Sequence, residues 1–141
     1  MCKITLLLMV FMALTYTFSK EKKVKQEYQK IITVIVDSPV FDSVYNDKVI
    51  RIKTDKFNQF KSKKPKKLEN GRNLVNSAEE NKYTGKPYLT LVSYKITSNN
   101  TEAFIVLFSE RSRKTFKAWL EKIEDQWILV RHEIINERSD E

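Results

Sequence analysis

His132 is the only histidine in the chain, so it is the one side chain that ordinarily changes charge near neutral pH. Strand alternation over residues 126–136 places it on the same face as Val130 and Ile134. Glu133 is its neighbour in sequence and therefore points to the other face, which leaves His132 without a carboxylate partner. His132 is thus a candidate general base for a small-molecule enzyme. The missing partner favours a binding protein over an enzyme.

Metal and serine-nucleophile chemistry lack the residue types that they need. A metal site requires three or four converging ligands, and the chain offers one histidine and a single cysteine, Cys2. The early carboxylates are spaced like helix caps and turn residues rather than like a metal-binding loop. They are Asp37, Asp42, Asp47 and Asp55. A serine triad would need a strained elbow motif, which is missing. We therefore expect no metal site and no cofactor.

A run of lysines, KSKKPKK at residues 61–67, is the strongest local charge feature. It could bind an acidic envelope polymer, a lipid surface or an acidic protein, or it could be a solvated loop that keeps the protein soluble. Nucleic acid would need the same charges. The run has no interleaved aromatic residues for base stacking, which disfavours nucleic acid. The candidate anion-binding residues are Lys61, Lys63, Lys64, Lys66 and Lys67, which we call the lysine run, together with Arg72.

Trp119 and Trp127 lie on two neighbouring predicted strands. Alternation places Trp119 opposite Phe116 and Leu120, and places Trp127 opposite the inward-facing Ile128. If helices cover the Phe116 face, both tryptophans are partly exposed on the open face of the sheet. Exposed aromatic residues on a sheet are typical of contact sites for proteins or ligands. The alternatives are that they fill the core or the interface of a homodimer.

The start of the chain indicates export. A short basic start is followed by an apolar run of eleven positions from Ile4 to Leu14, in which Thr5 is the one polar residue, and then by Thr17 and Ser19 at −3 and −1 of a cleavage site before Lys20. We expect residues 1–19 to be a signal peptide, with an uncleaved membrane anchor as the alternative. The apolar run is shorter than the ~20 residues that span a bilayer. A net charge of +8 and a mature chain without cysteine fit a periplasmic or extracellular protein of a bacterial envelope. Its partner is an unknown protein, a small ligand or an anionic surface.

The mature chain reads as one domain, residues 20–137, with a charged tail at 138–141. Apolar residues recur at helical spacing from Val24 to Ile35, which predicts a helix from about Lys20 to Val36. Ser38-Pro39 favours a short second helix, and residues 48–53 favour a brief strand. Residues 61–85 read as an exposed basic loop region.

Residues 88–136 contain four extended runs separated by short polar turns, which predicts an antiparallel meander. The predicted fold is therefore α+β: an N-terminal helix, or helices, packed on a curved antiparallel sheet of four main strands plus one short strand.

The end of the meander also carries a family resemblance. The stretch FKAWLEKIEDQWILVRHEII, from Phe116 to Ile135, resembles the cystatin-like and nuclear-transport-factor-2-like α+β roll proteins, many of them small and exported by bacteria. The likeness covers residues 86–136, and the first half of the chain matches only in the order of its elements. It implies a curved sheet wrapped against a helix, sometimes with a pocket between them. It implies no particular reaction, and the aspartate–histidine pairs of catalytic members have no counterpart here.

Overall fold

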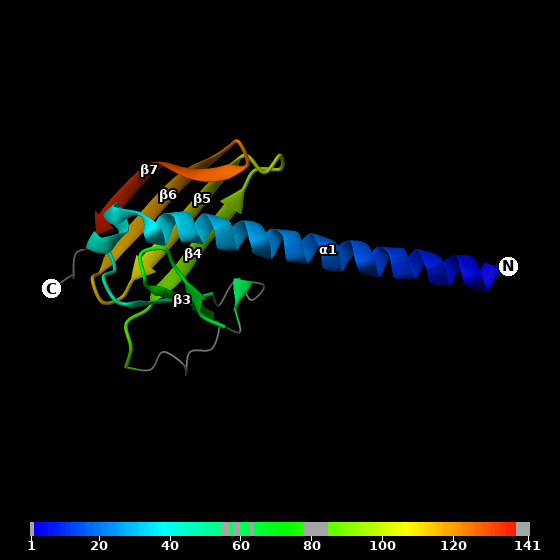
Figure 1. The fold of residues 1–141 in the computed structure, drawn as a ribbon, viewed down its shortest axis with the longest axis horizontal. Coiled ribbons are helices and arrows are strands. Elements are labelled where there is room, and N and C mark those ends of the chain that lie inside the picture. The colour runs from blue at the N-terminus through cyan, green and yellow to red at the C-terminus, as the bar shows by residue number, and fades with distance from the viewer. Residues whose placement is uncertain (1, 55–56, 58–59, 63, 78–84, 138–141) are drawn as a thin grey trace.

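The computed structural model describes residues 2–54, 57, 60–62, 64–77 and 85–137. It shows an α+β fold in which one long helix crosses a curled sheet (Figure 1). The elements are α1 (Cys2–Asp37), the 3₁₀ helix η1 (Pro39–Ser43), β1 (Val49–Lys53), β2 (Lys66–Lys67), β3 (Asn73–Ser77), β4 (Leu89–Ile96), β5 (Glu102–Ser109), β6 (Lys114–Ile123) and β7 (Gln126–Asn136).

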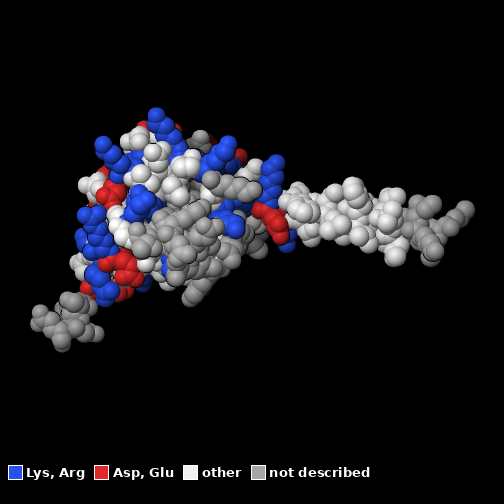
Figure 2. Space-filling model, turned by 90° about the horizontal axis from the view of Figure 1, so that it is seen from below, with Lys and Arg blue, Asp and Glu red and all other residues white. Residues whose placement is uncertain are grey.

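The predicted helix is confirmed, but it begins much earlier than Lys20. Its second half packs on the sheet through a fully buried stripe at positions 28, 31, 32 and 35. Its first half projects away from the sheet as a rod, and the part of this rod that is not drawn grey in Figure 2 shows no charged side chain. Among the described residues, no helix combines the length and apolar character that a membrane crossing requires. The helix ends at Asp37, two residues before Pro39.

The sheet corrects the predicted strand count. It contains seven strands in the order β2-β3-β1-β4-β5-β6-β7, rather than four main strands plus one short strand. It is also mixed and not purely antiparallel, because β1 runs parallel to both β3 and β4. The expected strand at residues 48–53 is β1, and the expected short helix is η1.

Strands β2 and β3 lie in the region predicted to be a loop. The sequence of β3, NLVNS, contains only two apolar residues, so it lacks the alternating apolar pattern by which a strand is recognised from sequence. Asn76 is nevertheless 1% exposed, because its side-chain oxygen accepts a hydrogen bond from the Tyr28 hydroxyl at 2.9 Å. Pairing with a buried helix residue allows a polar strand residue to enter the core.

The predicted meander of β4 to β7 is confirmed, and its turns use left-handed residues instead of glycine. Glu124 and Asp125 both have positive φ, at 50° and 63°, which is the geometry of a two-residue hairpin turn with the twist of the strands. Asn100 and Arg113 take the same region in the other two turns, with φ of 58° and 52°. A chain with two glycines thus builds three tight turns.

Two β-bulges decide which side chains face the helix. In β4 the register shifts between Leu91 and Ser93, so Leu89 and Leu91 and then Tyr94 and Ile96 all face α1. In β7, Trp119 pairs with Arg131 while Leu120 pairs with Leu129, which makes Val130 the extra residue. The prediction that Ile128 and Val130 point inward was therefore wrong: they are 42% and 48% exposed.

Candidate functional site

His132 lies on β7, the last strand of the sheet, and its side chain is exposed. Its ring stacks on Phe116, with 5.9 Å between the ring centroids. The enzyme hypothesis required His132 to line an enclosed cavity together with a carboxylate. The structure instead places it on the surface at the edge of the sheet.

The described lysines of the lysine run are exposed; Lys63 lies outside the described residues. Lys66 donates a hydrogen bond to Thr33 Oγ1 on α1 at 2.9 Å, so this part of the run is tied to the helix. Arg72 has a structural role, because its guanidinium group is engaged by other residues of the fold. Its guanidinium contacts the Val36 carbonyl at 2.5 Å and Asp42 Oδ1 at 3.0 Å, and it satisfies the C-terminal end of α1. Arg72 is therefore engaged in contacts of the fold, whereas the described lysines of the run are exposed.

The two tryptophans lie on opposite faces. Trp119 is on the open face as predicted, half-buried, with its ring 4.9 Å from that of Phe104 and the guanidinium of Arg131 at 4.4 Å. Trp127 was predicted on the same face, but it is 5% exposed and points toward α1. The bulge at Val130 accounts for this error. The extra residue shifts the alternation along β7 by one, so residues before and after it that were predicted on opposite faces, such as Trp127 and His132, lie on the same face.

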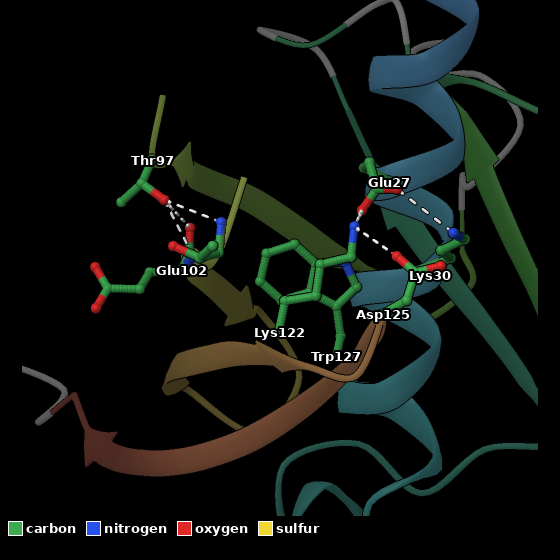
Figure 3. Close-up of polar contacts among 8 residues, drawn as sticks. Glu27, Lys30, Thr97, Glu102, Lys122, Asp125 and Trp127 are labelled. Atoms are coloured by element: carbon green, nitrogen blue, oxygen red, sulfur yellow. Dashed lines mark hydrogen bonds and ion pairs between the residues drawn. The ribbon is translucent and has the colours of Figure 1, made fainter. Parts of the chain in front are cut away.

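Trp127 belongs to a polar cluster at the junction of helix and sheet, which we call the Glu27 cluster: Glu27, Lys30, Lys122, Asp125 and Trp127 (Figure 3). Glu27 Oε2 accepts a hydrogen bond from Trp127 Nε1 at 2.7 Å and from Lys122 Nζ at 3.1 Å. Lys30 reaches Oε1 at 3.4 Å, and Asp125 pairs with Lys122 at 3.4 Å. The β6–β7 hairpin is thereby fixed to α1.

The charges of this cluster stabilise each other. Burial acts to raise the pKa of Glu27, but the hydrogen bonds from Trp127 and Lys122 and the lysine charges outweigh it, so the pKa lies below its ordinary value. Burial acts to lower the pKa of Lys122, and its bond and ion pair with Glu27, aided by Asp125, raise it overall. Both groups therefore stay ionised at neutral pH.

A cleft of about 560 Å³ lies beside this cluster, between α1 and the turn of the β4–β5 hairpin. We call it the hairpin cleft. Its volume is in the range of small-molecule sites. The residues that line it are Tyr16, Ser19, Lys20, Lys23, Val24 and Glu27 from α1, and Tyr94, Ile96, Thr97, Ser98 and Asn100 from the hairpin.

The hairpin cleft combines three kinds of surface. Val24 and Ile96 supply an apolar part, and the exposed Lys20 and Lys23 supply positive charge. The ring of Tyr94 also lines the cleft, and its buried hydroxyl has no hydrogen-bond partner among the described residues. Such an atom is uncommon in a folded protein, and it is satisfied only when water or a ligand reaches it.

The Tyr94 hydroxyl is held in its protonated form. Burial, together with the nearby charge of Glu27, raises its pKa to about 12. Its ring is fixed edge-on against the rings of Tyr28 and Phe60, at centroid distances of 5.6 Å and 4.9 Å. Tyr94 is therefore a rigid hydrogen-bond donor.

Sequence reasoning missed the Glu27 cluster. It included a pocket between helix and sheet, but not the residues that line the hairpin cleft. One signal for Glu27 was present, since it stands three residues after Val24 and four before Ile31 and so shares their helix face. A carboxylate on an apolar stripe must find partners. Its partners Lys122 and Trp127 could not be identified, because they lie about a hundred residues away.

The described residues contain no group of three or more acidic, histidine or cysteine side chains that could hold a metal ion. No protein-family model matches the chain, and neither a curated protein nor a solved structure is significantly similar to it.

Proposed function

We propose that this protein is an exported α+β roll of the cystatin-like or nuclear-transport-factor-2-like kind that binds an amphipathic anion in the hairpin cleft. The observation that carries the proposal is the buried, unpartnered hydroxyl of Tyr94 in a cleft that also presents Lys20 and Lys23. The basic and apolar start of the chain supports export.

The cleft favours a ligand with an apolar body and a negatively charged end. The apolar body packs on Val24, Ile96 and the ring of Tyr94. A carboxylate or phosphate lies near Lys20 and Lys23 and accepts the hydrogen bond that Tyr94 has to offer. Glu27 does not repel this anion strongly, because Lys122 and Lys30 already neutralise its charge.

Binding without chemistry is the function that these groups support. His132, which the enzyme alternative required, does not line the cleft. Tyr94 is a poor general base, since its pKa of about 12 keeps the proton on the hydroxyl at neutral pH. Glu27, the carboxylate that lines the cleft, is bonded to Trp127 and Lys122, so its basicity is reduced.

Titration of the full chain with octyl phosphate tests the proposal, with octanol as the ligand that lacks the charge. We expect saturable binding of octyl phosphate and at least about ten-fold weaker binding by the double variant Lys20→Glu/Lys23→Glu. The matched control is Lys61→Glu/Lys64→Glu, which changes the net charge equally at exposed lysines outside the cleft. Equal loss in both double variants would show a general charge effect and refute the cleft as the site.

Tyr94→Phe gives a second, independent test. The variant removes a hydroxyl that is unsatisfied in the free protein, so the free energy of unfolding should rise by about 1 kcal/mol. Octyl phosphate should bind about three- to ten-fold more weakly, because the ligand loses one hydrogen bond. Unchanged affinity in a stable Tyr94→Phe protein would remove Tyr94 from the site.

A further inference from the structure

The first half of α1 exposes a large apolar surface to solvent. Leu7, Phe11 and Phe18 are each at least 70% exposed, and large apolar side chains occupy every position from Leu6 to Met12. Such a run covers all sides of a helix rather than one stripe. We call residues 6–18 the apolar segment. It forms most of the white part of the rod that projects from the globular part in Figure 2.

The two threonine hydroxyls of the apolar segment are satisfied within the helix itself. Thr15 Oγ1 donates to the Met12 carbonyl at 2.9 Å, and Thr17 Oγ1 donates to the Leu14 carbonyl at 2.8 Å. Because of this back-bonding, neither threonine hydroxyl needs water. The segment is thus suited to an apolar medium such as lipid, where polar groups must find partners internally.

The end of the apolar segment and the residues that follow it fit the surface of a membrane. Tyr16, near the end of the segment, is 71% exposed, at the level where aromatic residues gather at the boundary between lipid and water. Four lysines follow the segment at positions 20, 22, 23 and 25, all exposed, with the exposed Glu21 among them. Clustered lysines next to a membrane-inserted helix are attracted to anionic headgroups.

We propose that the apolar segment is retained in the exported protein and inserts into an anionic lipid surface, which brings phosphate headgroups to the hairpin cleft. At 1.5 Å per residue the segment is about 20 Å long, more than the ~15 Å of one hydrocarbon leaflet. Tyr16 and Ser19 line the cleft together with Lys20 and Lys23, so the cleft lies where the helix leaves the lipid. The delivery of headgroups to the hairpin cleft rests on the proposed function, whereas the insertion of the apolar segment does not.

Cleavage before Lys20 would remove the whole apolar segment, because the bond between Ser19 and Lys20 follows it in the chain. The first test is the mass of the exported protein. An intact amino-terminal region is expected, and a mature chain beginning at Lys20 would overturn the inference.

Vesicle binding is the second test, with the full chain and vesicles of phosphatidylcholine with or without phosphatidylglycerol. We expect at least about ten-fold tighter binding when the anionic lipid is present. The variant Leu8→Asp/Phe11→Asp should lose vesicle binding and keep its affinity for octyl phosphate. Vesicle binding that survives this variant, or that ignores lipid charge, would overturn the inference.

Lysine variants separate the surface from the cleft. Lys22→Glu/Lys25→Glu should weaken binding to anionic vesicles but not to octyl phosphate, because these two lysines do not line the cleft. Lys20→Glu/Lys23→Glu should weaken both. If wild-type protein binds vesicles but not octyl phosphate, the proposed function fails and the insertion of the apolar segment stands. If wild-type protein binds octyl phosphate but not vesicles, the insertion of the apolar segment fails and the proposed function stands.

Discussion

Glu27→Gln should destabilise the fold by about 3 kcal/mol, because the carboxylate of Glu27 holds two buried donors at once. Its Oε2 accepts from Trp127 Nε1 at 2.7 Å and from Lys122 Nζ at 3.1 Å. The glutamine carbonyl can keep one of these donors, and its amide group then faces the other. A lost hydrogen bond to a charged group is worth roughly 1.5–3 kcal/mol, and the Lys122 ammonium, left with the exposed Asp125 as its ion-pair partner, adds to this.

The ion pair between Glu27 and Lys122 is expected to stabilise the fold more than a surface ion pair does, because it is buried. The side chains of Glu27 and Lys122 are only 10% and 13% exposed, so water and salt screen them little. The bond from Lys30 contributes little, because the lysine side chain is 52% exposed.

Urea unfolding provides the assay, and Glu121→Gln on the exposed side of β6 is the matched control. The control should change the free energy of unfolding by less than about 0.5 kcal/mol. In a Trp119→Phe background Trp127 is the single tryptophan, and its emission should shift to the red when Glu27 is replaced. A Glu27→Gln variant as stable as the control, with unshifted emission, would refute the role of this cluster.

Three further outcomes follow from the same contacts. The stability advantage of wild type over Glu27→Gln should be full at neutral pH and decline as the pH falls through the lowered pKa of Glu27; a gap that persists at pH 2 would contradict this. Arg72→Met should lower the free energy of unfolding by about 2 kcal/mol, because the Val36 carbonyl and Asp42 lose their partner, whereas Lys67→Met should have little effect on urea denaturation. If the lysine run binds polyanions, neutralising it should lower the salt concentration that elutes the protein from phosphocellulose; unchanged elution would leave the run as a solubilising surface.

The meander could be predicted from sequence because its signals are local. Each turn lies between runs of alternating or continuous apolar residues, and Glu124-Asp125 marks a hairpin without help from the rest of the chain. The buried stripe of α1 was equally visible, as was the position of the half-buried Trp119 on the open face of the sheet. These features depend on neighbours within a few residues.

The errors arose where one extra residue or a distant partner decides the outcome. Val130 is a single inserted residue, and it reverses the side on which Trp127 lies. No composition signal distinguishes such a bulge from regular strand. Strand β3 was missed for the other reason: its buried Asn76 is stable only because Tyr28, 48 residues earlier, donates a hydrogen bond to it.

The hydrogen bond between Trp127 and Glu27 has a consequence for how the chain folds. It joins residues separated by 100 positions, so the helix cannot be fixed to the β6–β7 hairpin until the last hairpin has been synthesised. Until then the buried stripe of α1 has no complete sheet to cover it. The contact between Trp127 and Glu27 thus belongs to the last stage of folding, when helix and sheet come together as one core.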